Sequence, residues 1–498
     1  MTAVSAAPLI RALLTQTECY GHPVGEVRLI ETHISWVLLA GDYAYKIKKP
    51  VNLGFLDFST LALRLHACEE EVRLNRRLAP DYYLGVVPIA GSPDAPHLGG
   101  AGGAFEYAVR MRRFPPEDTL DHLAQRGELD AEKIDRLAVR IARFHLHECA
   151  VATADMSWGE PEAIARPVAE NFQLLTERLP DSMQLKQLWD WSEAEHRRLT
   201  PLMKERKRAG FVRECHGDLH LGNLAWVDGE LVIFDCIEFS PALRWIDVIS
   251  EVAFCYMDLL HRRQDGLAMR FLNAWLEATG DYEGMALLRY YAVYRAMVRA
   301  KVAALRAGQA GGEAERAEVD ACLQLAARLA QGAQPQLWIT HGLSGSGKTT
   351  QTQFLLQQRG MIRLRSDVER KRLAGLEVLA RGGAGEGLYT QQAGERTYRH
   401  LVHLAEKLLD AGWPVIVDAA CLQRRQRDLF RDLARRRGVG FRILDVQADS
   451  AVLRERIAQR TEQGKDASDA DLGILQRQLE TAQPLAADEM AYVVAICG

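Results

Sequence analysis

His216-Gly217-Asp218-Leu219-His220-Leu221-Gly222-Asn223 and Gly342-Leu343-Ser344-Gly345-Ser346-Gly347-Lys348-Thr349 are the two stretches that decide the fold of this chain. Both patterns are typical of proteins that handle phosphate groups, but they occur in unrelated folds. One such pattern would predict one domain with one site. Two of them predict a fused chain with two nucleotide-binding sites, each on its own domain.

The second stretch fits the pattern G-x-x-x-x-G-K-[ST] in full. It follows an apolar segment, Leu337-Trp338-Ile339-Thr340, that predicts a strand, and it opens a predicted helix. In that setting the glycine-rich backbone wraps the phosphates of a nucleotide, the lysine reaches the β and γ phosphates, and the threonine hydroxyl binds Mg²⁺. The residues expected to bind the nucleotide are Gly342, Ser344, Gly345, Ser346, Gly347, Lys348 and Thr349.

Two aspartates beyond the glycine loop are candidates for the chemistry. Asp367 is expected to accept the proton of a substrate hydroxyl, with Arg370 holding a substrate anion. The alternative is that Ser366-x-x-Glu369 serves only as a helix capping box. Asp418 ends an apolar segment, 414–418, that predicts a buried parallel strand. Because open α/β sheets bind ligands at the carboxyl ends of their strands, Asp418 is expected to orient Mg²⁺ or substrate, unless it only closes a turn.

Several arginines follow in the same half of the chain. Arg456 and Arg460 are four residues apart on a predicted helix, where they either clamp the transferring phosphate from a lid or lie on a solvated face. Residues 335–498 hold 24 Lys and Arg against 20 Asp and Glu, and they include Arg424-Arg425-x-Arg427. This basic balance suits a phosphate-rich ligand and leaves open a 5′-hydroxyl kinase that acts on nucleic acid.

The first stretch supplies a carboxylate, Asp218, and an amide five residues later, Asn223. Asp235 ends a short apolar segment, Leu231-Val232-Ile233-Phe234, which predicts a strand. In a phosphotransferase, a carboxylate of this kind accepts the substrate proton, while the amide and the second carboxylate hold Mg²⁺.

An ion pair is expected upstream of this loop. Lys46 stands at a strand end and Glu71 on the helix that follows, where together they would fix the α and β phosphates. Lys48 and Lys49 compete with Lys46 for this role, and Glu70 competes with Glu71.

This set of residues resembles the aminoglycoside phosphotransferase and choline kinase family, a branch of the protein-kinase-like fold, over roughly residues 26–307. The roles that the resemblance implies are catalytic base for Asp218, Mg²⁺ binding for Asn223 and Asp235, phosphate binding for Lys46, pairing with Lys46 for Glu71, and bracing of the catalytic loop for Asp247. One family feature is absent, because residues 31–36 contain no glycine-rich loop ahead of Lys46.

Residues 336–489 resemble the small P-loop kinases, such as gluconate kinase and the 5′-hydroxyl polynucleotide kinases, on the glycine loop, Ser366-Asp367-x-x-Arg370 and Val417-Asp418. Together the two halves resemble bacterial fusions of an aminoglycoside phosphotransferase-like domain with an ATP-binding domain. We therefore expect an α+β two-lobed protein-kinase-like domain over residues 1–331. An α/β P-loop domain with a parallel sheet is expected over residues 332–498.

Composition bears on where the protein is expected to work. The 498 residues include 9 cysteines without a C-x-x-C pattern, which indicates free thiols in a reduced cytoplasm. The segment Met1 to Leu14 does not have the form of a signal peptide, and no apolar stretch is long enough to predict a membrane span. We expect a cytoplasmic protein without a membrane partner.

The function expected from these residues is transfer of the ATP γ-phosphate to a hydroxyl group of a small molecule, with ATP and Mg²⁺ as cofactors. Asp218 would assist attack at the first site and Asp367 at the second. Nucleic acid is a less favoured acceptor for the second site. A third hypothesis, suggested by the missing glycine loop, is that one domain is a non-catalytic nucleotide sensor that regulates the other.

Overall fold

The computed structural model describes residues 3–54, 56–100, 102–310, 312–377, 390–463 and 471–494. The chain forms two compact units. The first consists of Met1–Lys133, Arg143–Glu170 and Thr200–Asp258, and the second of Ile134–Ala142, Asn171–Leu199 and Leu259–Gly498. The expected fold class is confirmed, because a kinase-like region with its sheet first is followed by a parallel P-loop sheet.

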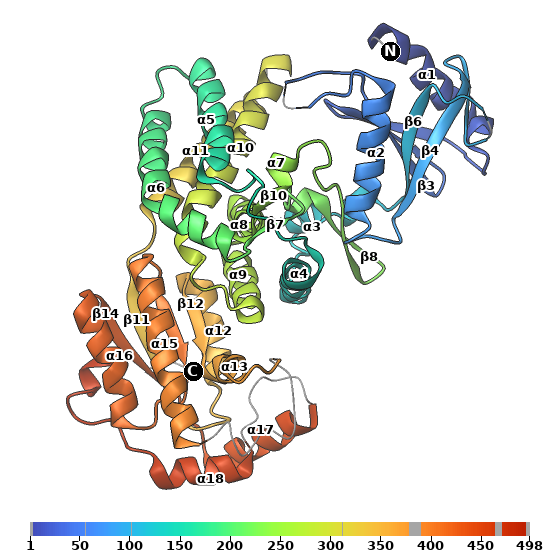
Figure 1. Ribbon diagram of the computed structural model, residues 1–498. Helices are drawn as coiled ribbons and strands as arrows, with labels where there is room; N and C mark the ends of the chain where they lie inside the picture. The colour runs from blue at the N-terminus through green and yellow to red at the C-terminus, as the bar shows by residue number, and fades with distance from the viewer. Residues whose placement is uncertain are drawn as a thin grey trace. The chain divides into compact units, whose positions relative to one another are not determined.

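The first unit opens with a six-stranded antiparallel sheet of order β1-β2-β3-β6-β4-β5, drawn in blue in Figure 1. Its strands are β1 (Val27–Glu31), β2 (Ser35–Ala40), β3 (Tyr43–Lys48), β4 (Tyr83–Ser92), β5 (Ala95–Leu98) and β6 (Glu106–Arg112). Helix α1 (Ala3–Thr15) precedes the sheet, and α2 (Leu61–Asn75) packs against β4 and β6. Thr60 caps the start of helix α2, because its side chain accepts a hydrogen bond from the Leu63 N–H.

Two short antiparallel pairs flank residues 216–223, the stretch expected to form the catalytic loop of the first unit. Strand β7 (Val212–Glu214) pairs with β10 (Trp245–Asp247), and β8 (Leu224–Val227) pairs with β9 (Glu230–Ile233) through a turn at Asp228-Gly229. The neighbouring helices are α3 (Leu120–Arg126), α7 (Pro241–Arg244) and α8 (Val248–His261). Helices α4 (Ala131–Arg143), α5 (Pro161–Arg178) and α6 (Met183–Arg208) each have residues in both units.

The second unit contains a five-stranded sheet of order β12-β13-β11-β14-β15, in which every neighbouring pair is parallel. Its strands are β11 (Gln336–His341), β12 (Ile362–Arg365), β13 (Val415–Asp418), β14 (Gly440–Asp445) and β15 (Val493–Val494). The helices that follow these strands are α12 (Lys348–Arg359), α13 (Ser366–Leu373), α15 (Gln391–Asp410), α16 (Arg424–Arg437), α17 (Ser450–Gln463) and α18 (Leu472–Thr481). Figure 1 shows α15 and α16 alongside the sheet, with which both are in contact.

Three helices ahead of this sheet belong to the same compact unit: α9 (Asp265–Thr279), α10 (Met285–Ala310) and α11 (Glu313–Gln331). Helix α11 ends at Gln331 and β11 begins at Gln336. The division into domains near Gln331 stays a prediction, since the compact unit itself begins earlier in the chain. Within the described part of the chain, no helix has the length and apolar character needed to cross a bilayer.

Candidate active sites

The glycine loop joins β11 to α12 and has a backbone that only glycine adopts easily. Gly345 and Gly347 have φ values of +82° and +98°, and a Cβ at Gly342 would lie 2.3 Å from the carbonyl oxygen of Val446. The Lys348 Nζ donates to the Leu343 carbonyl oxygen at 2.7 Å, and the buried Ser346 hydroxyl has no hydrogen-bond partner among the described residues. A loop of this shape, with an uncommitted hydroxyl and a helix N-terminus behind it, fits a bound phosphate chain.

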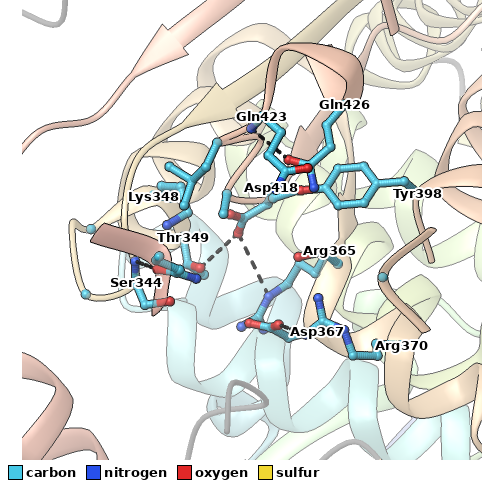
Figure 2. A pocket seen from close by; sticks show the side chains of 18 of the residues that line it. Ser344, Lys348, Thr349, Arg365, Asp367, Arg370, Tyr398, Asp418, Gln423 and Gln426 are labelled. Carbon is cyan, nitrogen blue, oxygen red and sulfur yellow. Dashed lines mark hydrogen bonds and ion pairs between the residues drawn. The ribbon is translucent and has the colours of Figure 1, made fainter. Parts of the chain in front are cut away.

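Asp418 lies directly beside the loop because β13 and β11 are neighbours in the sheet and end at the same edge. The Thr349 hydroxyl donates to Asp418 Oδ2 at 2.8 Å, and the Thr352 hydroxyl reaches the same oxygen at 3.4 Å. Figure 2 shows Asp418 between Thr349 and Arg365, whose Nε is 4.0 Å from Asp418 Oδ2. Hydroxyl and carboxylate oxygens are the ligands that Mg²⁺ prefers, so this pair fits the ion expected from the sequence.

A pocket of about 330 Å³ opens at this edge of the sheet. Its polar and charged lining includes Ser344, Lys348, Thr349, Arg365, Asp367, Arg370, Tyr398, Asp418, Gln423, Gln426, Arg456 and Gln478. Asp367 and Arg370, one turn apart on α13, form an ion pair at 2.7 Å. The structure therefore brings the aspartates expected at this site, together with the glycine loop, to one cavity.

The capping-box alternative for Ser366-x-x-Glu369 is wrong. Ser366 is the first residue of α13 rather than its cap, and the N-cap position has no side-chain hydrogen bond. Glu369 is buried and bonds to His400 and Arg372 instead. Asp367 lines the pocket from the first turn of α13.

Several pocket residues were not singled out from the sequence. Arg365 ends β12, Tyr398 comes from α15, and Gln423 and Gln426 form a capping box at the start of α16. The spacing Gln423-x-x-Gln426 could have indicated the two glutamines as a helix start, but no sequence signal indicated Arg365 or Tyr398. Gln478 of α18 accepts a hydrogen bond from the Ser344 N–H at 2.9 Å.

Of the two arginines that could clamp the transferring phosphate, the structure places the side chain of one, Arg456. Arg456 of α17 lines the pocket and its Nη1 donates to the Gly345 carbonyl oxygen at 3.3 Å. The side chain of Arg460 lies outside the described residues.

The basic cluster that suggested nucleic-acid binding is committed to ion pairs within the domain. Arg424 pairs with Asp428 and Asp488. Arg427 is fully buried against Glu489, and Arg425 bonds to Glu395. Burial keeps Arg427 away from any nucleic-acid backbone, whereas the side chains of Arg424 and Arg425 stay 34% and 56% exposed.

The predicted ion pair of the first unit is present. Lys46 of β3 bonds to Glu71 Oε1 of α2 at 2.9 Å and to Asp235 Oδ1 at 2.5 Å. Asp235 has a left-handed φ of +65°, and its N–H donates to the Tyr83 hydroxyl at 3.0 Å. Its side chain is 43% exposed, which leaves the second carboxylate oxygen open to a cation.

The competing lysines and glutamates differ in their partners. Lys48 is two residues from Lys46 on the same face of β3, is fully buried, and bonds to both Glu71 and Glu238. Lys49 pairs with the exposed Glu31. Burial alone would raise the pKa of Glu71, but the two lysines lower it to about 2. Glu70 turns to Arg73 and Arg244 instead.

The catalytic loop brings Asp218 and Asn223 into contact. The Asn223 Nδ2 donates to the backbone and side-chain oxygens of Asp218, both at 3.0 Å, so that its own amide oxygen faces elsewhere. Phe234, next to Asp235, donates its N–H to Asn223 O and accepts from His216 Nε2 at 2.8 Å. Burial lowers the pKa of His216, which favours a neutral ring, and a proton on Nε2 fits both contacts because Nδ1 accepts the Asp218 N–H at 3.2 Å. His216, Asp218, Asn223 and Phe234 therefore share one hydrogen-bonded network, and Asp235 follows Phe234 directly in the chain.

The expectation that Asp247 braces this loop is wrong. Asp247 pairs with Arg206 at 2.7 Å and accepts from the Ile249 N–H. Glu251 braces the loop instead, because its two oxygens accept the N–H groups of His216 and Gly217 at 3.1 and 2.7 Å. Glu251 lies in the first turn of α8, and nothing in its local sequence distinguishes it from an exposed glutamate on a helix.

The turn between β1 and β2 contains only residues 32–34. The Thr32 hydroxyl closes it by accepting the N–H groups of Ile34 and Ser35. In the protein-kinase fold a glycine-rich loop at this position covers the phosphates. The turn observed here is three residues long and contains no glycine.

Two regions of the chain match known families. Residues 57–288 match the phosphotransferase enzyme family, and residues 337–485 match the AAA domain family. The folds, the two sites and these matches together support a phosphotransferase that joins a kinase-like domain to a P-loop kinase domain. The uncharacterized protein Rv2004c of Mycobacterium tuberculosis is 31% identical over 455 residues, which cover 88% of each chain. This chain belongs to the same family.

Solved structures resemble each half separately. A gluconokinase from Sinorhizobium meliloti is 22% identical, covers 33% of this chain and 83% of its own, and has a TM-score of 0.24. A choline kinase from Cryptosporidium parvum is 12% identical, covers 61% of this chain and 88% of its own, and has a TM-score of 0.39. With TM-scores below 0.5, neither likeness bears on what this chain does.

Proposed function

We propose that the P-loop site is an ATP-dependent kinase site that phosphorylates a hydroxyl group of a small molecule. The observation that carries this proposal is the contact of Thr349 with Asp418 in a pocket that also holds Asp367 and Arg370. Mg²⁺, when bound, would neutralise charge on the phosphates. Thr349 and Asp418 would hold the ion, and Lys348 would exchange the Leu343 carbonyl oxygen for phosphate oxygens.

Asp367 would accept the proton of the acceptor hydroxyl. As this proton leaves, the hydroxyl oxygen bonds to the γ-phosphorus and the bond to the bridging oxygen of ADP breaks. The pocket adds two guanidinium groups, Arg365 and Arg370, and the amides of Gln423 and Gln426. This lining favours an acceptor that carries several hydroxyl groups and one anionic group.

Transfer of labelled γ-phosphate from ATP into a pooled metabolite extract tests this proposal. Asp367→Asn is expected to slow transfer by about 100-fold, because a positioned base contributes on that order. Lys348→Ala should abolish the same labelled product. A full rate of transfer by Asp367→Asn would contradict the assignment of the base.

We infer that the first site also binds Mg-ATP, through Lys46, Asn223 and Asp235, with Asp218 as its base. The short turn at residues 32–34 is the observation that favours the alternative role of a nucleotide sensor at this site. Asp218→Asn decides between the two roles in the same assay. If it removes a labelled product that Lys348→Ala retains, the chain is bifunctional. If Lys348→Ala alone removes all products, the first domain is a sensor.

A further inference from the structure

Helix α9 lies within the region that matches the phosphotransferase family, yet it contacts β12 and α12 of the P-loop fold. Strand β12 is an edge strand, and such strands present unpaired backbone groups. The buried Asn273 of α9 covers this edge. Its Oδ1 accepts the Arg363 N–H at 2.7 Å, and its Nδ2 donates to the Met361 carbonyl oxygen at 3.1 Å. Helix α9 is therefore hydrogen-bonded to the strand that leads into the pocket.

Glu277 lies one turn further along α9 and binds two arginines of β12. Its Oε1 accepts from Arg363 Nη2 at 2.6 Å, and its Oε2 is 3.3 Å from Arg365 Nη1. Arg363 in turn lies 3.3 Å from the Thr349 carbonyl oxygen and 3.4 Å from the Thr352 hydroxyl. A single carboxylate of α9 thus contacts the arginine that supports the first turn of α12 and the arginine that lines the pocket.

Arg365 stands between two carboxylates. It bonds to Glu277 through Nη1, while its Nε is 4.0 Å from Asp418 Oδ2, the contact drawn in Figure 2. The same Asp418 oxygen accepts the hydrogen bond of the Thr349 hydroxyl. Charges at this separation attract appreciably in a partly buried site. Without the charge of Glu277, Arg365 would be drawn toward Asp418.

We propose that Glu277 is a positioning residue of the P-loop site, which holds Arg365 away from Asp418 so that the Asp418 carboxylate stays available to Mg²⁺. This inference rests on the proposed binding of Mg-nucleotide at that site. It goes further by making the site depend on a helix from the phosphotransferase region. The second kinase site is complete only when α9 is docked on β12.

The test measures how much Mg²⁺ the full chain needs to bind AMPPNP, a non-hydrolysable ATP analogue, by calorimetry. An Asp235→Asn background keeps the first site from contributing. Glu277→Gln is expected to raise the Mg²⁺ concentration for half-maximal AMPPNP binding by about tenfold, the usual cost of disturbing the partners of metal ligands. Glu277→Asp, which keeps the charge on a shorter side chain, should raise it less.

Two further variants separate positioning from packing. Arg289→Ala removes a bond to the Gly412 carbonyl oxygen and a stacking contact with Trp413, which join α10 to the P-loop fold away from the pocket. It should leave the Mg²⁺ requirement unchanged. Adding Arg365→Ala to Glu277→Gln should return the requirement to that of Arg365→Ala alone, because the arginine that competes for Asp418 is gone.

The outcomes distinguish this inference from the proposed function. An unchanged Mg²⁺ requirement in Glu277→Gln, or an equal rise in Arg289→Ala, overturns the positioning role while nucleotide binding stands. The Asp235→Asn chain should bind Mg-AMPPNP, and adding Lys348→Ala should abolish that binding. If the Asp235→Asn chain shows no such binding, both the positioning role of Glu277 and the proposed function of the P-loop site are overturned. If Glu277→Gln does not fold, Glu277→Asp decides, and an unchanged requirement in that variant also overturns the role.

Discussion

One buried carboxylate, that of Glu251, holds the catalytic loop of the first unit in place. Glu251 accepts two backbone N–H groups of that loop and a bond from His145 at 3.0 Å. Burial opposes its ionisation, but His145 and its other partners lower the pKa of Glu251 to about 2. A charged acceptor at this position fixes the direction in which the loop leaves β7.

Replacing Glu251 with Gln should therefore disturb both stability and binding. A neutral amide can accept only one of the two N–H groups, so the free energy of unfolding should fall by about 1.5–3 kcal/mol. In a Lys348→Ala background, the affinity for Mg-AMPPNP at the first site should fall with it. Asp247→Asn is the matched control, since it loses a buried pair with Arg206 that does not touch the loop. Equal nucleotide affinities in the two variants would contradict the bracing role of Glu251.

The lowered pKa of Glu71 should make the stability of the protein depend on pH. Its pKa is about 2 in the folded protein and about 4.5 when it is free, so its pairing with Lys46 and Lys48 stabilises the fold fully above pH 4.5. This stability is lost as pH falls from about 4.5 toward 2. Urea unfolding between pH 6 and pH 3 should show a smaller loss in Glu71→Gln than in wild type. Glu69→Gln, an exposed position on the same helix, should behave like wild type.

At the scale of elements, α9 and β12 form one hydrogen-bonded junction through Asn273. Asn273→Ala leaves a buried N–H and a buried carbonyl without their partners, and should lower the free energy of unfolding by about 2–4 kcal/mol. Alanine is a better helix former than asparagine, so any loss reflects the strand contacts rather than α9 itself. Urea unfolding of the full chain measures this. An unchanged midpoint would show that the edge of β12 does not need the amide.

At the scale of the whole molecule, the P-loop fold is not expected to stand alone. A chain cut to residues 332–498 retains the glycine loop, Asp367 and Asp418, but it exposes Arg363 and the edge of β12. We expect such a fragment to bind Mg-AMPPNP more weakly than the full chain and to associate through its open edge. Calorimetry and light scattering measure both properties. A monomeric fragment with the affinity of the full chain would contradict this expectation.

Much of each site could be predicted from the sequence because its residues are close together along the chain. The glycine loop, the Asp218–Asn223 spacing and the position of Asp235 just after β9 are local patterns, and local backbone geometry places their side chains. Lys46 was harder to choose, since Lys48 lies on the same face of β3 and shares Glu71 with it. Only the position of Asp235 in the folded unit separates the two lysines.

The sequence by itself determined the two folds and the glycine loop, and it indicated the side chains that we propose to bind Mg²⁺, because each depends on residues within one or two adjacent elements. The tertiary structure alone decided that Glu251 rather than Asp247 braces the catalytic loop, and that Glu277 reaches Arg363 across 86 residues of chain. A glutamate on a helix has the same local pattern whether it faces water or two arginines. Its role is fixed by which element packs against it, and that depends on the fold of the whole unit.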